Sequence, residues 1–140
     1  MALFKRSGSR NAETSATIFI VDDEEPLLEL AEAFLAPIGY DVRTFKTAEK
    51  ALKEYIECGD TPPALVVTDY WMARMSGMDL IRECRQLHPG QKTILISGTV
   101  DGTVFADATV KPDQFVAKPY DVKFLMDLIQ EMVAEAEAGH

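Results

Sequence analysis

Five short segments of the chain have the length and side-chain pattern of β-strands. The clearest is 64–69, a continuous Leu/Val run that follows two prolines and ends in Asp69. A continuous apolar run of this length predicts a strand that is buried on both faces. Residues 17–21, 93–96 and 114–117 have the same character. Residues 40–44 alternate apolar and polar side chains, which predicts a strand at the edge of the sheet.

Amphipathic helical patterns lie between these strands, so strands and helices alternate along the chain. This alternation predicts an α/β fold with a parallel sheet. Pro26 suits a first helical turn, and we expect Thr47 and Asp121 to be the N-caps of later helices. The positions expected to face the core from the first helix are Leu27, Leu30, Ala31, Phe34 and Ile38.

The stretch 99–113 breaks this regularity. It contains many β-branched residues, is interrupted by Gly102 and ends in Lys111-Pro112-Asp113. β-Branched residues and glycine have low helix propensity, and proline ends helices. We therefore expect the helix between the last two strands to be short or irregular.

Reactive side chains stand where the apolar strands end. Asp22-Asp23 follow the first strand, Asp69 closes the run 64–69, Ser97 follows 93–96 and Lys118 follows 114–117. In an open parallel α/β sheet, sites form at the carboxyl ends of the strands, so these groups are expected to converge. Taken singly, each has a commoner structural role as a helix cap, turn residue or exposed strand end. Their joint placement favours one shared site, because capping gives no reason for all of them to meet.

The order Asp-Asp, Asp, Ser, Lys-Pro, with its spacing, resembles the receiver domain of two-component response regulators over residues 17–133. The resemblance implies a flavodoxin-like fold, a three-layer α/β/α sandwich around a five-stranded parallel sheet of order 2-1-3-4-5. The first and third strands are neighbours in that order. Asp22 and Asp23 would therefore face Asp69 where the strand order reverses.

Asp69 is then the candidate phosphoryl acceptor. A carboxylate that attacks phosphorus forms an aspartyl-phosphate, a mixed anhydride whose ready hydrolysis suits a reversible signal. Three adjacent carboxylates repel one another by about 4 kcal/mol per pair at ~4 Å and an effective dielectric of ~20. A divalent cation offsets both this repulsion and the charge of the incoming phosphoryl group. Few protein ligands, completed by waters and phosphate oxygens, favour Mg2+.

The resemblance also implies which groups hold the metal. Asp23 and Asp69 would contact Mg2+ directly, and Asp22 would do so through water. The backbone carbonyl of Trp71 would supply a further ligand.

Lys118, Ser97 and Phe115 receive roles from the same resemblance. Lys118 would pair with Asp69 before the reaction and with a phosphoryl oxygen after it. The Ser97 hydroxyl would donate a hydrogen bond to a second phosphoryl oxygen. On activation Ser97 would move toward the phosphoryl group, and Phe115 would turn inward behind it. An ordinary core role for Phe115 is equally open. The family usually has a cis peptide bond at Lys118-Pro119.

Three residues depart from the family pattern. Gly98 stands where alanine is usual, and Ala73 replaces a proline in the loop that carries the metal-binding carbonyl. Trp71 replaces a commonly polar residue two positions after the acceptor. We hypothesise that its indole shields the anhydride from water and slows the loss of phosphate.

Length, charge and cysteine content bound the remaining possibilities. The 140 residues suit one domain over 17–134, with a disordered tail over 1–16 and a frayed end over 135–140. The net charge of −9 argues against direct nucleic acid binding, which needs a basic face. No stretch approaches the length of a membrane span. Cys58 and Cys84 lie on separate expected helices, which is typical of reduced thiols in a cytoplasmic protein.

These observations favour a phosphoacceptor that catalyses only its own phosphorylation and dephosphorylation. Its phosphate would come from a histidine kinase or a histidine phosphotransfer protein. The face formed by 99–113, the strand 114–117 and the final helix would be presented to a downstream partner or a fused output domain, and a homodimer is a further option.

Two other functions stay open at this point. A phosphatase of the haloacid-dehalogenase type also uses a strand-end aspartate, but it needs Asp-x-Asp after the first strand and usually a cap domain. A receiver that docks without phosphate is kept open by the irregular stretch 99–113. The presence of all five site side chains counts against it.

Overall fold

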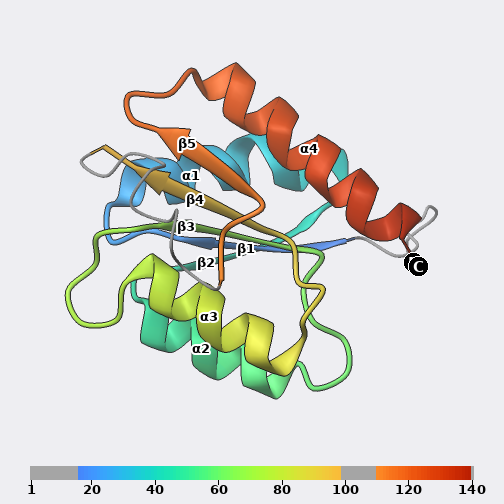
Figure 1. Ribbon diagram of the computed structural model, residues 1–140. Coiled ribbons are helices and arrows are strands. Elements are labelled where there is room, and N and C mark those ends of the chain that lie inside the picture. Colours follow the sequence, from blue (N-terminus) through green and yellow to red (C-terminus); the bar gives the residue numbers. More distant parts are fainter. Residues whose placement is uncertain (1–15, 99–109, 140) are drawn as a thin grey trace.

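A five-stranded parallel sheet forms the centre of the protein (Figure 1). The computed structural model describes residues 16–98 and 110–139. The strand order is β2-β1-β3-β4-β5. The strands are β1 (Thr17–Val21), β2 (Asp41–Phe45), β3 (Leu65–Asp69), β4 (Thr93–Ser97) and β5 (Gln114–Ala117). The predicted fold class and strand order are confirmed, with β2 at the edge as expected.

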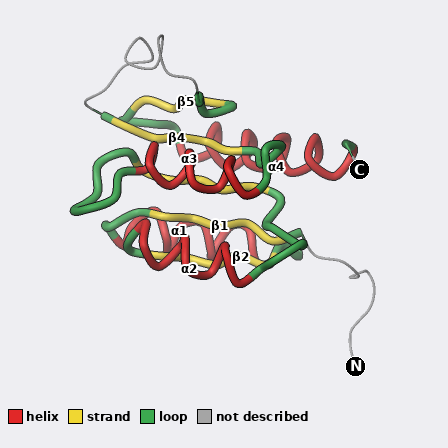
Figure 2. Tube along the Cα trace, turned by 60° about the horizontal axis from the view of Figure 1, so that its bottom comes forward, coloured by secondary structure: helices red, strands yellow, loops and turns green. Residues whose placement is uncertain are grey.

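Two helical layers cover the sheet. The helices are α1 (Glu25–Leu35), α2 (Ala48–Glu57), α3 (Gly77–Leu87) and α4 (Val122–Ala138), and a short 3-10 helix, Ala36–Ile38, follows α1. Helices α1 and α4 lie on one face, and α2 and α3 lie on the other (Figures 1 and 2). The expected helix within 99–113 falls largely in 99–109, outside the described residues.

The alternation of side chains along β1 builds both cores. Ile18 and Ile20 point into the cluster shared with α1 and α4, whereas Phe19 and Val21 point into the cluster shared with α2 and α3. Successive residues of a strand face opposite sides, so one apolar run fills both layers. This explains why the apolar residues of β1, β3 and β4 are consecutive rather than alternating with polar ones.

The expected buried face of α1 is partly wrong. Leu28 and Leu35 are buried, whereas Phe34 is 51% and Ile38 56% exposed. The helix has apolar side chains around most of its circumference, so two overlapping stripes fit the sequence. Packing against the sheet selects the stripe of Leu28 and Leu35, and the chain leaves α-helical geometry at Ala36 before Ile38 is reached.

Side-chain caps start three of the helices. Thr47 accepts from Lys50 N–H at 3.1 Å, and Asp121 accepts from Lys123 N–H at 3.2 Å, so both predicted caps are confirmed. Ser76 begins α3 with a capping box, in which its hydroxyl accepts from Asp79 N–H and its own N–H donates to the Asp79 carboxylate. The box satisfies two backbone N–H groups at the start of α3, which follows the loop after Asp69.

The start of β5 is tied to β4 and α3 by hydrogen bonds and an ion pair. Asp113 Oδ2 accepts from Thr93 N–H at 2.8 Å and pairs with Arg85 Nη2 at 2.8 Å. Arg85 also donates to the carbonyl oxygens of Gln91 and Lys111, both at 2.9 Å. One guanidinium on α3 therefore fixes the start of β5 beside β4.

The last helix is long. α4 continues to Ala138, beyond residue 134, where the sequence suggested that the domain ends. Within the described ranges, no helix has both the length and the apolar character needed to cross a membrane.

Candidate functional site

Three carboxylates meet at the carboxyl ends of β1 and β3. Asp69 is the last residue of β3, and Asp22 and Asp23 directly follow β1. The parallel register pairs Val21 with Thr68, which brings the two strand ends level. Each aspartate offers one carboxylate oxygen, and the three oxygens lie within 4.8 Å of one another. The structure therefore brings together the acidic residues that the sequence predicted.

Two of these carboxylates are buried. Asp22 is 3% and Asp69 is 5% exposed, while Asp23 is exposed. Burial raises the pKa of Asp22 to about 6, with smaller contributions from the charges of Asp69 and Asp23. Burial also raises the pKa of Asp69, against the opposing effect of Lys118. Removing water from adjacent carboxylates disfavours their charged forms, so this group requires a positive partner.

Asp22 does not serve as a helix cap. The N-cap of α1 is Glu24, and no side chain makes a capping hydrogen bond there. The Asp22 Oδ1 atom accepts from Glu24 N–H at 2.9 Å, just before the helix begins. This hydrogen bond holds the carboxylate at the strand end and favours its charged form.

Lys118 supplies the positive group. Its ammonium nitrogen lies 3.1 Å from Asp69 Oδ1, and its backbone N–H donates to the carbonyl oxygen of Ser97 at 3.0 Å. Burial lowers the pKa of Lys118, but the hydrogen bond that its ammonium donates to Asp69 and the charges of Asp69, Asp22 and Glu24 outweigh that effect and raise the pKa. The Lys118–Pro119 peptide bond is cis, as the resemblance implied.

The chemistry of this donor set fits a hard divalent cation. One lysine balances only one of the three carboxylates, so charged carboxylates leave a net charge of about −2 in a largely buried pocket. Carboxylate oxygens are the ligands that Mg2+ takes in proteins. The residues that are able to hold it are Asp22, Asp23 and Asp69.

The other predicted site residues lie around this group. Ser97 is buried at the end of β4 and pairs with Ala117 in the sheet. Trp71 is 56% exposed, with its ring 4.9 Å from that of Tyr70 in an edge-on arrangement. Phe115, on β5, is half-buried and packs against the cluster of Met78, Ile81 and Leu95.

Two glycines near the site were not predicted to matter for its geometry. A Cβ atom at Gly77 would overlap the backbone carbonyl oxygen of Asp69 and lie 3.0 Å from its carbonyl carbon. Gly77 N–H also donates to the carbonyl oxygen of Tyr70 at 2.9 Å. The sequence signal was available, because Ser76 and Asp79 have the spacing of a capping box, but the close approach to Asp69 depends on the fold. The second glycine is Gly98, whose neighbour is Lys118.

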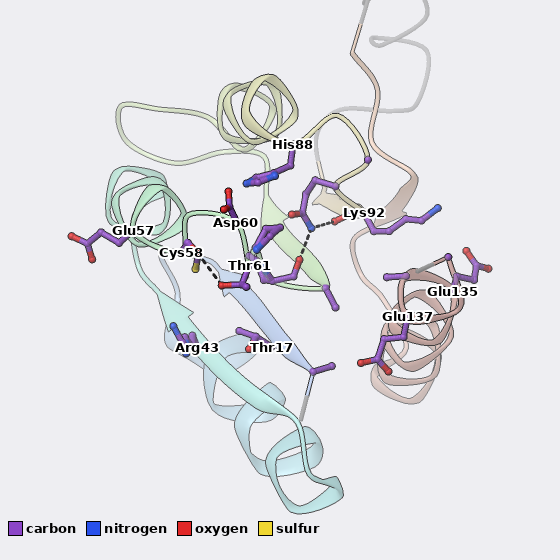
Figure 3. A pocket seen from close by; sticks show the side chains of 18 residues that line it. Thr17, Arg43, Glu57, Cys58, Asp60, Thr61, His88, Lys92, Glu135 and Glu137 are labelled. Atoms are coloured by element: carbon purple, nitrogen blue, oxygen red, sulfur yellow. Dashed lines mark hydrogen bonds between the residues drawn. The ribbon is translucent and has the colours of Figure 1, made fainter. Parts of the chain in front are cut away.

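A hollow of about 530 Å³ adjoins Asp22, one of the three carboxylates of the site. Its lining includes Asp22 and Lys118 together with Glu24, Pro26 and Tyr120. A larger hollow, of about 1030 Å³, lies at the opposite ends of the strands (Figure 3). Arg43, Glu57, His88 and Glu137 line it, and none of the predicted site residues does. Size alone therefore does not locate the chemistry, and the convergence of charged groups does.

Comparisons with known proteins agree on one family. A model of the response regulator receiver domain matches residues 18–130. The chain is 32% identical over 127 residues to the sensor kinase CckA of Brucella abortus, covering 88% of this chain and 13% of CckA. It is 31% identical over 117 residues to the response regulator RR06 of Streptococcus pneumoniae, covering 83% of this chain and 52% of RR06. This chain therefore spans about half of RR06 and a much smaller part of CckA.

A solved structure of similar sequence supports the same family. The crystal structure of a CheY-like response regulator receiver domain protein from Methanospirillum hungatei superposes with a TM-score of 0.78. The two chains are 26% identical, and the superposition covers 91% of this chain and 100% of the other.

Proposed function

Because the chain belongs to the response regulator receiver domain family, we propose that Asp69 is the residue that accepts a phosphoryl group. The chain is a receiver domain of the two-component response regulators, a class that serves signalling. One observation supports Asp69 as the acceptor. Its carboxylate has an oxygen within 4.8 Å of oxygens of Asp22 and Asp23, and its Oδ1 atom lies 3.1 Å from the ammonium of Lys118.

Asp69 acts as a nucleophile in this proposal. One carboxylate oxygen forms a bond to phosphorus, the bond between phosphorus and the donor breaks, and the donor group leaves with the electron pair. The product is an acyl phosphate on Asp69, which water hydrolyses to inorganic phosphate and the free carboxylate. The domain thereby catalyses its own phosphorylation and dephosphorylation and no other reaction.

The proposed metal ion is Mg2+. When bound, it supplies positive charge that offsets the carboxylates and the phosphoryl oxygens. Asp23 and Asp69 hold it directly, Asp22 holds it through water, and the backbone carbonyl of Trp71 completes the protein ligands. The burial of Asp22 and Asp69 supports this assignment, because buried charges need a counter-ion.

Lys118 and Ser97 stabilise the transferred group. The Lys118 ammonium, already beside Asp69, moves its hydrogen bond to a phosphoryl oxygen as negative charge develops there. The Ser97 hydroxyl donates to another phosphoryl oxygen. The two residues are linked by the hydrogen bond from Lys118 N–H to the Ser97 carbonyl, so the strand ends that carry them are held together.

The effect of phosphorylation is transmitted from the site through β5 and the segments beside it. Receiver domains pair with sensor kinases and with output domains. For this chain we propose that the phosphate donor is a histidine kinase or a histidine phosphotransfer protein. We also propose that the receiver domain covers residues 17–134 and that the protein is cytoplasmic. Phe115 reports the phosphorylated state at the face formed by β5 and α4. The phosphoryl group must favour one of two conformations for this to occur.

The decisive experiment is incubation with acetyl phosphate, with and without Mg2+, followed by intact mass measurement. Wild type is expected to gain one phosphoryl group only when Mg2+ is present, and Asp69→Asn is expected to gain none. Asp60→Asn is the matched control, because Asp60 is an exposed aspartate in the hollow at the far end of the sheet.

Each other result has a definite meaning. An unmodified wild type with Mg2+ present overturns the phosphoacceptor function and favours a docking receiver. Equal labelling of wild type and Asp69→Asn would show that another residue is the acceptor. Continued release of phosphate from many phosphate esters favours a phosphatase.

A further inference from the structure

Burial of its own side chains holds β5 only weakly in the sheet. Among the strands of the described residues, it alone contains exposed residues, Gln114 and Ala117. Only Val116 is buried, and Phe115 is half-buried. β5 also lies at the edge of the sheet, where β4 is its single neighbour. The buried face of a strand normally specifies its register, so contacts at the ends of β5 have a larger share in setting its register.

The side chain of Arg85 holds the start of β5. Its Nε atom donates to the carbonyl oxygen of Gln91 and its Nη1 atom to that of Lys111, both at 2.9 Å. Its Nη2 atom lies 2.8 Å from Asp113 Oδ2, and the same oxygen accepts from Thr93 N–H at 2.8 Å. We call these contacts the Arg85 clamp. The Arg85 and Asp113 side chains are 19% and 28% exposed, so water competes with the clamp less than with a surface ion pair.

The other end of β5 leads into Lys118. Its backbone N–H donates to the Ser97 carbonyl at 3.0 Å, and its ammonium lies 3.1 Å from Asp69 Oδ1. Lys118 follows Asp113 by five residues, which is about 16 Å of extended chain. A slip of one residue between β4 and β5 would move the Lys118 backbone by about 3.3 Å and turn its side chain to the opposite face of the sheet. The ion pair with Asp69 therefore requires the observed register.

We propose that Arg85 is a positioning residue, whose clamp on the start of β5 keeps the strand in the register from which the Lys118 ammonium reaches Asp69. Its catalytic consequence rests on the proposed phosphoacceptor function. The clamp holds Thr93, the first residue of β4, whereas the predicted site residue Ser97 is the last. Arg85 therefore lies at the far end of the strand from the reacting groups and acts through β5.

A different effect of removing the guanidinium is a general loss of stability. The two effects are separable, because a smaller folded fraction lowers the phosphorylation rate by the same factor with and without Lys118. If Arg85 acts by placing the ammonium, its replacement loses most of its effect once the ammonium is removed. A double-mutant cycle between Arg85 and Lys118 measures the difference.

The test compares wild type, Arg85→Met, Lys118→Ala and the double variant in the rate of phosphorylation at saturating acetyl phosphate and Mg2+. Methionine keeps an unbranched stem but removes every donor of the guanidinium. A displacement of about 1 Å at a reacting group costs about 100-fold in rate. Because the hydrogen bond to Ser97 still holds the far end of β5, we expect a smaller displacement and a rate about three- to tenfold below wild type. In the Lys118→Ala background we expect a change of less than about twofold.

Two further variants complete the comparison. Arg82→Met is the matched control, because Arg82 lies on the same helix and makes an exposed ion pair with Asp79 at 2.9 Å. It should leave the phosphorylation rate unchanged. Asp113→Asn tests the clamp even if Arg85→Met does not fold, because it removes the charge that pairs with Arg85 and keeps an oxygen acceptor for Thr93 N–H. We expect Asp113→Asn to slow phosphorylation by about twofold or more, again only when the lysine is present.

Binding of Mg2+ gives a readout that a general structural defect would change. Trp71, the single tryptophan of the sequence, allows titration of Mg2+ by fluorescence. Because the carboxylates of the site lie at the ends of β1 and β3, we expect the dissociation constant of Arg85→Met to stay within about twofold of wild type. An unchanged phosphorylation rate, an equal loss in both lysine backgrounds, or a parallel loss of Mg2+ affinity overturns the proposal.

A crystal structure of Arg85→Met without phosphate decides the point independently of phosphorylation. We expect the Lys118 ammonium to lie farther from Asp69 Oδ1 than the 3.1 Å of the wild-type chain. An unchanged distance overturns the positioning role. If wild type takes up no phosphate, the proposed function fails, and this distance still determines whether Arg85 places the lysine.

Discussion

Lys118 reaches Asp69 across an intervening strand. Asp69 ends β3 and Lys118 follows β5, with β4 between them, and the ammonium nitrogen lies 3.1 Å from Asp69 Oδ1. The same carboxylate belongs to the group that Asp22 and Asp23 complete. One aspartate therefore belongs to a candidate metal site and also pairs with a positive charge, which is the arrangement that the proposed phosphoryl transfer uses.

Replacement of Lys118 is expected to slow phosphorylation without preventing Mg2+ binding. Lys118→Ala removes the only positive group that the described residues place within ion-pair distance of Asp69, so we expect at least a tenfold lower rate with acetyl phosphate. Lys123→Ala is the control, because Lys123 is exposed on α4 and pairs with Asp127 at 2.7 Å. Equal rates for Lys118→Ala and wild type would remove Lys118 from the mechanism.

Asp22 is expected to make the stability of the metal-free protein depend on pH. Its pKa is raised to about 6 in the folded chain, from an ordinary value of 3.8. Between these values the folded state keeps a proton that the unfolded state has lost, so stability falls as the pH rises through this window. At pH 7 we expect Asp22→Asn to increase the free energy of unfolding by about 1–3 kcal/mol.

Urea unfolding of both proteins in the presence of a chelator measures this difference. The gain should shrink as the pH is lowered and vanish below about pH 4, where both states are protonated. Asp60→Asn, at an exposed position, should show no such gain at any pH. A gain from Asp22→Asn that is independent of pH would mean that its charge is not the cause.

Trp71 is expected to slow the loss of phosphate from Asp69. Its indole stands two residues after the acceptor and packs edge-on against Tyr70, with 4.9 Å between the ring centres. Trp71→Asn should hydrolyse about three- to tenfold faster, because water then approaches the anhydride more easily. Phe124→Asn is the control, since Phe124 on α4 is 55% exposed, close to the 56% of Trp71. Loss of phosphate at the wild-type rate or slower refutes the shielding hypothesis.

Gly77 is expected to tolerate no side chain. A methyl group there would overlap the carbonyl oxygen of Asp69, and backbone atoms cannot yield as a flexible side chain can. We expect Gly77→Ala to cost about 2 kcal/mol or more of stability and to lower the phosphorylation rate. Gly90→Ala, which meets no atom within 4 Å, should change neither quantity much. Normal stability and rate in Gly77→Ala would show that α3 moves away from Asp69 at little cost.

The strands and their terminal side chains were predictable from the sequence because local chemistry determines them. Apolar runs specify buried strands, and a parallel sheet then brings Asp22 and Asp69 to one edge regardless of the loops between them. The roles of Ser97, Trp71 and Phe115 came only from the resemblance to a family. They stay proposals.

Other features depend on distances between separate elements, which the sequence does not contain. In α1, Phe34 and Leu35 are adjacent and both are apolar. Only packing against the sheet determines that Leu35 is the buried residue of the two. The close approaches of Gly77 to Asp69 and of Gly98 to Lys118 likewise join segments far apart along the chain. A glycine signals conformational freedom or a close contact, but not which atom it meets.

The identity of the modified residue tests the central claim most directly. After incubation with acetyl phosphate and Mg2+, reduction with borohydride converts an aspartyl-phosphate to homoserine, which peptide mass spectrometry locates. We predict homoserine at position 69 alone, and only in the sample that contained Mg2+. Homoserine at any other position, or its absence from a sample treated with donor and metal, would contradict the account.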